Sequence, residues 1–343
     1  MYRHFFVPVD DTDAGIDTVA YAVEFARSIG ARITFVQARL DAVREVRGAR
    51  EAATPPPDAV ARPSREGGRA SEWPIAKAEA AARARGVPCD SARVTGATTA
   101  GALADAMLER DCDLLCIAPA PADVDLSSTR ALAADRLAAQ GIAVLTCAFR
   151  RSPATARVIA ALYDDHRAVT GALDAWLAQL RAAIEGGRAL DAADARAIAN
   201  GLSNLRNRRH PKEERWFYPV LRGVTGAVDA ELGELERQHR RNARMLFALL
   251  DAIEADIACD APPTRFEQAL SAYAQCVCEH IGRHEGVIVP AAQRYLSDDD
   301  WRAIDVSIAT AAPPIDRIAT HPHPERTLMR TDTNEQRADG SST

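Results

Sequence analysis

Apolar and polar positions follow two different patterns along the chain, and the pattern changes near residue 150. In the first part, short apolar runs with the length of buried strands are separated by amphipathic stretches with helical spacing. The runs are FFVPVD, ARITFVQA, VPCDSARV, DLLCIAPA and IAVLTCAF, and the helical stretches cover residues 15–28, 76–85, 100–110 and 129–139. Strands that alternate with helices predict a doubly wound parallel sheet, an α/β fold, for residues 1–150. Residues 46–69, rich in Pro, Arg and Ala, predict a solvated loop.

From residue 154 onward the strand pattern gives way to long amphipathic patterns. They cover residues 156–185, 192–221, 227–258 and 265–295, and a short helical pattern follows at 298–308. Short connections between long amphipathic helices predict antiparallel neighbours. We therefore expect an all-α, up-down four-helix bundle over residues 154–312. The remaining residues, 313–343, are polar and rich in Pro, Thr and Arg, which predicts a disordered tail.

Composition and charge narrow the possible partners. The formal net charge is −6, so the chain lacks the basic excess that neutralises nucleic-acid phosphates. No apolar run approaches the roughly 18 residues of a membrane helix, and the first residues lack the layout of a signal peptide. Seven scattered cysteines do not form a disulfide framework. We therefore expect a cytoplasmic protein that binds neither nucleic acid nor membranes.

Histidines lie on the apolar stripes that would face the bundle core. A helix advances about 100° per residue, which places His166 and His239 on the leucine stripes of the first and third bundle helices. On the fourth helix, His280 and His284 are one turn apart. A single inward histidine is usually a hydrogen-bonded core residue, whereas several at a similar depth predict a shared metal ion. Carboxylates beside them favour iron or manganese.

The second bundle helix leaves two arrangements open. Its apolar stripe, extended, turns Arg209 and Glu213 inward. However, Pro211 inside the helix removes a hydrogen bond and produces a kink, so the local phase is uncertain. Either His210 and Glu214 rotate into the core, or His210 and Glu213 both flank the site.

Two segments, RRHPKEERWFYPVL and CEHIGRHEGVIVPAAQRYLSDDDWRAID, resemble the hemerythrin/HHE cation-binding family, and the similarity covers about residues 155–310. The resemblance implies an up-down bundle with a non-haem iron site, often di-iron and oxo-bridged. His166, His239 and His280 match the family's ligand positions on helices one, three and four. The metal ligands are therefore expected among His166, His210, Glu213, Glu214, His239, His280 and His284.

The chain departs from this family at two positions. The family typically has two histidines before Pro-Lys-Glu, where this chain has Arg209 and then His210. It usually places a bridging carboxylate one turn after the histidine of helix four, where this chain has His284. Glu285 follows directly, but an ideal helix turns it away by about 100°. The departures favour a mononuclear or altered site over a symmetric di-iron centre. Cys276, one turn before His280, is expected to face inward, and Cys278 to face elsewhere.

The first part of the chain resembles the universal stress protein family, through VPVDDTDAG, VTGATTAGALADAMLERDCDLLCIA and GIAVLTC. In that family Asp10 would contact a nucleotide at the end of the first strand. Its nucleotide binders also carry a Gly-x-x-Gly turn, where this chain reads Ala-Pro-Ala-Pro from residue 118. Proline removes an amide donor, which argues against ATP. Ser127 and Ser128 could still cap the next helix and hold an anion.

Together these features predict a cytoplasmic stress-response protein. We expect its bundle to bind one or two non-haem iron ions and to sense or handle O2, NO or peroxide, and its α/β domain to form a homodimer as the resemblance implies. A binding or sensor protein is favoured over an enzyme, because the sequence shows no dedicated catalytic acid and base. The alternative is a metal-free interaction or scaffold protein with a degenerate metal site and a dimerising stress-protein domain.

Overall fold

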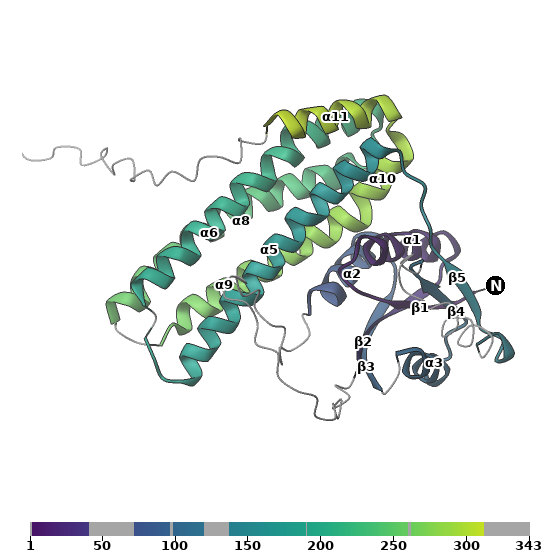
Figure 1. Cartoon of the computed structure of the whole chain (residues 1–343), viewed down its shortest axis with the longest axis horizontal. Helices are drawn as coiled ribbons and strands as arrows, with labels where there is room; N and C mark the ends of the chain where they lie inside the picture. Colours follow the sequence, from purple (N-terminus) through teal and green to yellow (C-terminus); the bar gives the residue numbers. More distant parts are fainter. Residues whose placement is uncertain are drawn as a thin grey trace, which may run out of the picture.

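The computed structural model of the chain describes residues 2–40, 72–96, 99–119, 137–189, 191–259 and 262–311. These residues form a sheet domain and a helical bundle that lie side by side (Figure 1). The predicted loop at 46–69, the predicted tail at 313–343 and most of the predicted helix at 129–139 lie outside the described residues.

The N-terminal part is a parallel sheet of five strands in the order β3-β2-β1-β4-β5, which confirms the predicted α/β fold. The strands are β1 (His4–Pro8), β2 (Arg32–Leu40), β3 (Cys89–Gly96), β4 (Leu114–Ile117) and β5 (Ala143–Thr146). The helices are α1 (Asp13–Ile29), α2 (Trp73–Ala84) and α3 (Thr99–Glu109). Side chains alternate between the two faces of β1, because Phe5 and Val7 pack with α1 and α2 while Phe6 packs with α3.

The loop between β1 and α1 is ordered by its own side chains. The carboxylate of Asp10 accepts hydrogen bonds from the backbone N–H of Thr12 (2.9 Å) and from its hydroxyl (2.6 Å). The Thr12 hydroxyl in turn accepts from the N–H of Gly15 at 3.0 Å and caps α1. A Cβ atom at Gly15 would overlap the Asp10 carboxylate. Asp10 therefore acts here as a turn-forming residue.

The C-terminal part is predominantly helical and forms the predicted bundle. Its segments are α5 (Pro153–Glu185), α6 (Ala192–Pro211), η1 (Lys212–Phe217), α7 (Tyr218–Val224), α8 (Asp229–Cys259), α9 (Thr264–Arg283), η2 (His284–Ile288), α10 (Val289–Tyr295) and α11 (Asp298–Ala311). Helix α5 packs beside α6 and α9, and α8 packs beside the same two helices, so the four long segments form a closed ring. Helix α11 crosses the end of the bundle over α5 (Figure 1).

Two segments of the bundle depart from α-helical geometry. Each of η1 and η2 is a π-helical turn, and each precedes an α-helix whose second residue is a proline, Pro219 in α7 and Pro290 in α10. A π-helical turn takes i→i+5 hydrogen bonds, and it shifts every later side chain around the helix axis. The predicted second and fourth bundle helices are therefore each divided into three parts, and the phase of an ideal helix does not apply across them.

The sheet domain packs on the bundle through α1 and α2, which contact α9 and η2 (Figure 1). Apolar residues are shared across this contact, because Ile16 of α1 and Trp73 of α2 each belong to an apolar cluster of the bundle. Gly282 and Gly286 lie one turn apart where the helices meet. A Cβ atom at Gly282 would overlap the backbone carbonyl of Lys77, and one at Gly286 would overlap the side chain of Ala81. The two glycines thus permit the close approach of α9 and α2.

We expect Gly286→Ala to weaken the contact between the domains. The added methyl group has no room against α2, and overpacking of this kind typically costs about 1–3 kcal/mol. Gly171→Ala is the matched control, because Gly171 lies in α5 and a methyl group there would meet no described atom within 4 Å. That control should be neutral or stabilising by up to about 1 kcal/mol. Chemical denaturation of both variants would show equal stability if the close approach did not exist in solution.

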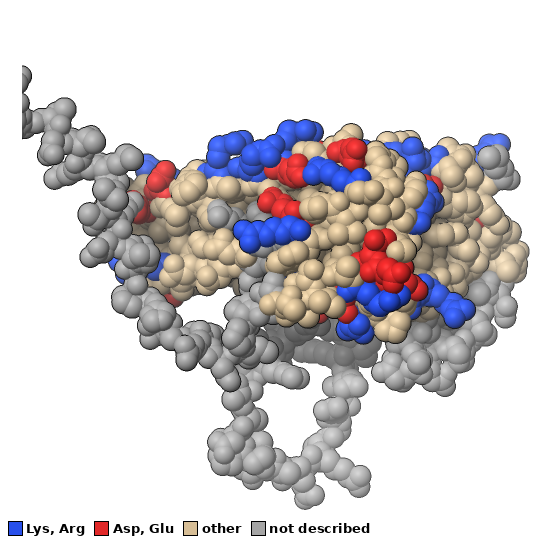
Figure 2. Space-filling view, turned by 90° about the horizontal axis from the view of Figure 1, so that it is seen from above, with Lys and Arg blue, Asp and Glu red and all other residues tan. Residues whose placement is uncertain are grey.

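Charged side chains of both signs are intermixed over the face shown in Figure 2. Among the helices that the structure describes, none combines the length and the apolar character needed to cross a bilayer.

Candidate metal centre

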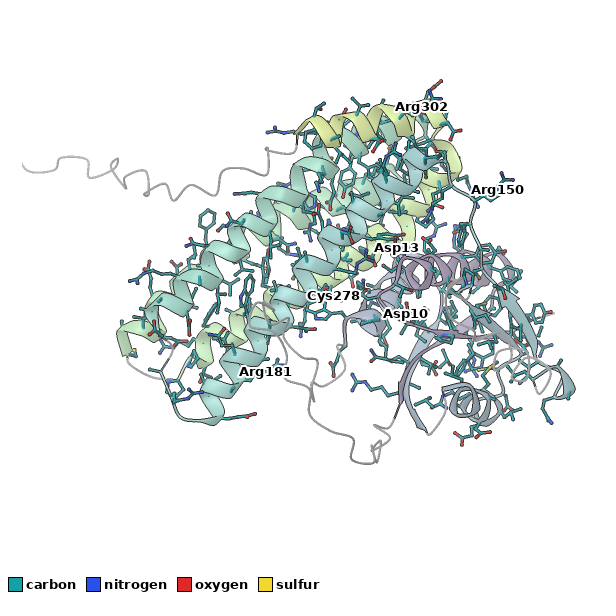
Figure 3. The ribbon with its side chains drawn as sticks, in the orientation of Figure 1. Asp10, Asp13, Arg150, Arg181, Cys278 and Arg302 are labelled. Atoms are coloured by element: carbon teal, nitrogen blue, oxygen red, sulfur yellow. The ribbon has the colours of Figure 1, made fainter. Side chains whose placement is uncertain are left out.

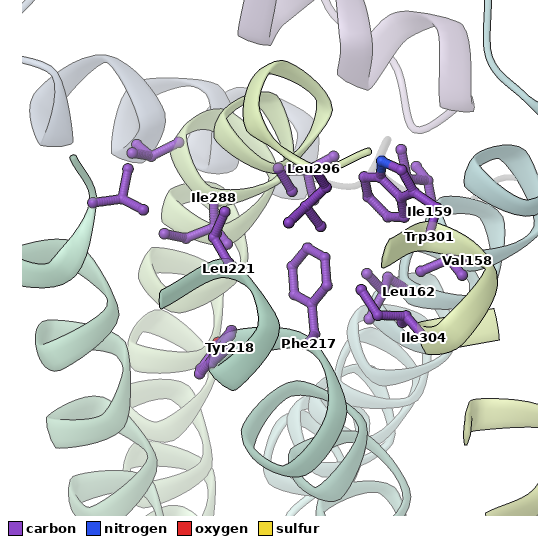
Figure 4. Packing of buried hydrophobic residues seen from close by; sticks show 14 of the residues in the cluster. Val158, Ile159, Leu162, Phe217, Tyr218, Leu221, Ile288, Leu296, Trp301 and Ile304 are labelled. Atoms are coloured by element: carbon purple, nitrogen blue, oxygen red, sulfur yellow. The ribbon is translucent and has the colours of Figure 1, made fainter. Parts of the chain in front are cut away.

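A layer of polar side chains crosses the bundle between two apolar clusters. It contains four buried residues from different segments, namely His166 of α5, Glu213 of η1, His239 of α8 and His280 of α9. Leu162 and Phe217 belong to the cluster on one side of this layer, and Val169 and Leu246 to the cluster on the other. Figure 4 shows the first cluster, where Phe217 packs against Trp301 of α11. The apolar residues on both sides exclude bulk water from the layer and strengthen the electrostatic interactions within it.

Three of these side chains converge on one point. Glu213 Oε2 lies 2.9 Å from His239 Nε2 and 3.3 Å from His280 Nε2. The two imidazole nitrogens lie 3.2 Å from each other. One ligand atom from each residue lies within 4.8 Å of the other two, so a single ion could contact all three. Two imidazoles and one carboxylate form a donor set that suits non-haem iron.

Carboxylates outside this group orient two of the histidine rings. His239 Nδ1 lies 2.5 Å from Glu214 Oε1, and His166 Nδ1 lies 2.9 Å from Glu285 Oε1. A carboxylate accepts a hydrogen bond from Nδ1–H, which leaves the Nε2 lone pair of each ring directed into the layer. Metal-binding histidines commonly donate their second nitrogen to a carboxylate in this way. The arrangement fixes the tautomer that a metal ligand requires.

The residues present fit a bound cation. Within the described residues no hydrogen-bond donor reaches His166 Nε2, Glu213 Oε1 or either ring nitrogen of His284. In the neutral tautomer set by Glu214, His239 Nε2 is also an acceptor, and it directly faces the Glu213 carboxylate. Acceptors that face one another in a buried layer are costly unless a proton or a metal ion lies between them.

The electrostatics favour an ionised Glu213 carboxylate and neutral imidazoles at His280 and His284. Burial alone raises the pKa of the Glu213 carboxyl, but the neighbouring imidazoles and Arg209 lower it well below its ordinary value. Burial lowers the pKa of His280 well below its ordinary value and that of His284 to about 3. Both rings are therefore neutral near pH 7 and keep a lone pair available.

The pKa values of the other two histidines move the opposite way. Burial alone would lower the pKa of His166 and of His239, but their carboxylate partners outweigh it and raise both above the ordinary value. The carboxyl pKa of Glu285 falls to about 2, because Lys77 and His166 outweigh its burial. In the absence of a metal ion, protons on His166 and His239 would therefore balance the buried carboxylates.

Arg209 occupies the side of Glu213 that faces away from His239 and His280. Its guanidinium is buried, and Nε lies 3.5 Å from Glu213 Oε1. His166 Nε2 lies 3.6 Å from the same oxygen. One oxygen of Glu213 thus faces the two imidazoles, and the other faces a fixed positive charge. That charge opposes a second cation at this side.

His284 lies beside this group without belonging to it. Its ring centroid is 5.2 Å from that of His166, 5.7 Å from that of Phe217 and 5.9 Å from that of Tyr218. The hydroxyl of Tyr218 donates a hydrogen bond to Glu213 Oε2 at 3.2 Å. Tyr218 thereby helps to fix the carboxylate that the imidazoles face.

The structure places the sequence-predicted residues as follows. His166, Glu213, His239 and His280 lie together, His284 lies next to them, and the exposed Glu214 contacts the group only through His239. On the second helix, Arg209 and Glu213 face the core, as the extended apolar stripe predicts, and Glu214 does not rotate inward. The side chain of His210 lies outside the described residues, as do Ser127 and Ser128. Asp10 is exposed in the β1–α1 turn.

Two predictions about the fourth helix are wrong. Glu285 does not turn away from the site, because it contacts His166, and it is buried since α2 covers this side of η2. Cys278 is buried in an apolar cluster, whereas Cys276 is only half-buried.

Sequence reasoning also missed Tyr218 and Lys77. Tyr218 lies five residues after Glu213 in the segment WFYP, a spacing that a π-helical turn brings onto one face. Lys77 lies between two alanines in the first half of α2, which is a weak signal for a buried partner.

Comparisons with known proteins divide the chain in the same way as the structure. Residues 1–120 match the sequence model of the universal stress protein family. Residues 155–292 match that of the hemerythrin HHE cation binding domain. The chain thus carries a universal stress protein domain followed by a hemerythrin HHE domain. Together the two matches support a stress-related protein with a metal-binding domain.

Two solved structures are similar to part of the chain. One is a universal stress protein in complex with cAMP, with 17% identity, 43% of this chain and 97% of that chain covered, and a TM-score of 0.30. The other is a protein of the universal stress protein family from Burkholderia pseudomallei, with 18% identity, 43% and 96% covered, and a TM-score of 0.27. No curated protein matches the chain.

Proposed function

We propose that the bundle binds one non-haem iron ion through Glu213, His239 and His280, and that the protein senses or handles O2, NO or peroxide in a stress response. The observation that supports this most strongly is the convergence of Glu213 Oε2, His239 Nε2 and His280 Nε2 in a buried layer. Two histidines and one carboxylate are the donor set of non-haem iron sites that keep open positions.

An iron ion in such a site supplies Lewis acidity, one-electron redox chemistry and open positions for a small ligand. The chain's own residues prepare the site for it. Glu214 accepts a hydrogen bond from Nδ1–H of His239, so that Nε2 keeps its lone pair available for the metal ion. Tyr218 holds the Glu213 carboxylate by a hydrogen bond. The apolar clusters exclude water and larger molecules, which favours a small diatomic ligand over a bulky substrate.

One ion, rather than two, fits the charges of the site. Arg209 lies at the second oxygen of Glu213, where a second ion would have to be bound. His284 stands where the family usually places a bridging carboxylate, so it contributes no negative charge. His166 and His284 lie beside each other next to this group, and neither side chain is a carboxylate that could bridge two metals.

The metal content of the purified protein tests this proposal. Protein expressed in iron-rich medium and purified aerobically should contain one iron per chain and lack the near-ultraviolet charge-transfer bands of an oxo-bridged pair. Addition of NO to the reduced protein should change its visible spectrum. Two irons per chain with oxo-bridge bands would contradict the single-ion site. Iron-free protein would contradict the metal function as a whole.

The second candidate is a metal-free interaction protein, and one observation favours it. Arg209 already supplies a positive charge to Glu213, and the raised pKa values of His166 and His239 allow protons to take the place of an ion. The layer would then be a hydrogen-bonded core, and the sheet domain would mediate dimerisation. Iron-free protein that elutes as a homodimer would support this candidate. The homodimer remains an expectation from the resemblance.

A further inference from the structure

Lys77 of the sheet domain lies buried at the contact with the bundle. Its side chain is 4% exposed, and Nζ lies 2.5 Å from Asp11 Oδ1 and 3.1 Å from Glu285 Oε2. The two carboxylates come from different domains, Asp11 from the β1–α1 loop and Glu285 from η2. Burial of a lysine is costly unless its charge is paired, and here it is paired on both sides. Lys77 therefore joins the two domains through a buried charge.

Glu285 continues this connection into the bundle. While Oε2 faces Lys77, Oε1 lies 2.9 Å from His166 Nδ1. His166 Nε2 then faces Glu213 Oε1 at 3.6 Å. A continuous series of polar contacts thus runs from Asp11 through Lys77, Glu285 and His166 to the carboxylate of the candidate metal centre.

A second set of hydrogen bonds joins the β1–α1 loop to Arg167, the residue after His166. Arg167 Nη1 donates hydrogen bonds to the backbone carbonyl of Asp11 at 3.1 Å and to the Asp13 carboxylate at 2.8 Å. In Figure 3, Asp10 and Asp13 lie where the sheet domain meets the bundle. The β1–α1 loop is therefore fixed to α5 directly and to η2 through Lys77.

We propose that Lys77 is a positioning residue of the metal centre, supplied to the bundle by the other domain. It holds the Glu285 carboxylate, which accepts a hydrogen bond from Nδ1–H of His166 and keeps His166 Nε2 directed at Glu213. The metal part of this inference rests on the proposed function. Outer contacts that orient metal-site histidines are worth about 10- to 100-fold in metal affinity. Lys77 acts through Glu285, so the sheet domain affects the orientation of His166 inside the bundle.

The variant Lys77→Met tests the proposal, because it keeps an unbranched side chain of similar length and removes the charge. The control is Arg83→Met, since Arg83 makes another contact between the domains, a 2.8 Å ion pair with Glu279 at the surface. With Co²⁺ alone as the probe, K77M should weaken binding about 10-fold, within the range for outer contacts. R83M should change it by less than about 3-fold, because exposed ion pairs contribute little.

A second measurement follows the His166 ring in the metal-free protein. The ¹⁵N chemical shifts of its two ring nitrogens report which one carries the proton. At a pH high enough to make the His166 ring neutral, wild-type protein and R83M should show a single Nδ1–H tautomer, and K77M should show a mixture. Unchanged shifts together with unchanged Co²⁺ affinity in K77M would overturn the proposal. If the wild type binds no Co²⁺, the proposed metal function fails, but the shifts still decide whether Lys77 positions His166.

Glu285→Gln completes a double-mutant cycle with K77M. If Lys77 acts through Glu285, K77M should add nothing in the E285Q background. Additive effects on Co²⁺ affinity would overturn the proposed route. Should K77M alone fail to fold, E285Q and the double variant carry the test, because the double variant removes both buried charges and leaves only the partly exposed Asp11 without Lys77. Both must then show the same altered His166 shifts, and shifts like those of the wild type would overturn the proposal.

Discussion

Glu213→Gln should abolish stoichiometric metal binding and lower Co²⁺ affinity by more than the roughly 100-fold upper range for outer contacts. Glu213 is the one carboxylate in the group of three converging ligand atoms, and its Oε2 faces both His239 and His280. Glutamine keeps the size of the side chain but removes the negative charge that attracts the ion. It also removes the carboxylate that lies beside the buried Arg209 guanidinium. Titration of metal-free protein with Co²⁺, followed by its visible absorption, measures the loss.

The neighbouring variant Glu214→Gln is the matched control for this experiment. Glu214 is exposed and contacts the site through His239, from which it accepts an Nδ1–H hydrogen bond. The side-chain oxygen of glutamine can still accept that hydrogen bond. We therefore expect E214Q to retain one metal ion per chain, with an affinity at most about 10-fold weaker. If E213Q bound Co²⁺ as tightly as E214Q, the carboxylate of Glu213 would not be a ligand, and the proposed site would be wrong.

Arg209→His combined with His284→Glu should raise the metal content from one ion to two per chain. The first change removes the positive charge beside Glu213 Oε1 and adds an imidazole. The second adds a carboxylate next to His166, whose ring centroid lies 5.2 Å from that of His284. Together they supply the negative charge and the ligand atoms that the wild-type site does not offer to a second ion. Metal analysis would show the second ion, and aerobic protein should gain the near-ultraviolet bands of an oxo-bridged pair.

The single variants separate the two contributions. R209H alone relieves the repulsion but leaves Glu213 as the only carboxylate in the layer, so it should still bind one ion. H284E alone places its new carboxylate near Arg209, and the resulting ion pair should keep the second position closed. A double variant that holds a single ion would show that the charge of Arg209 does not set the number of metals.

Much of the architecture could be predicted from periodicity alone. The strands are short and strongly apolar, and the bundle helices carry long stripes with a helical period, so local pattern and tertiary environment agree. The same arithmetic correctly turned His166, His239 and His280 inward, because these positions lie within regular α-helix. It also turned Arg209 inward, since the shift in phase begins only at Lys212.

The predictions failed where the helices are irregular or where the other domain intervenes. Sequence reasoning placed Glu285 away from the site, because it assumed that only the bundle would bury the fourth helix. In the structure α2 covers the opposite side of η2, and Glu285 is buried between Lys77 and His166. The contact of Tyr218 with Glu213 depends on the π-helical turn between them, and a regular α-helix pattern gives no warning of such a turn. The partnership of Lys77 and Glu285 spans 208 positions and leaves no local signal.

The fit of Gly282 and Gly286 against α2 makes the chain less modular than two separate family matches suggest. Two domains joined only by a linker can exchange partners during evolution, because neither shapes the surface of the other. Here one side of the bundle is completed by α2, and Ile16 and Trp73 of the sheet domain belong to the bundle's own apolar clusters. A larger residue on either helix has no room unless the facing helix becomes smaller. Substitutions at Ala81 and Gly286 should therefore be correlated across the history of this fusion, and a bundle borrowed from another protein would not fit this sheet domain.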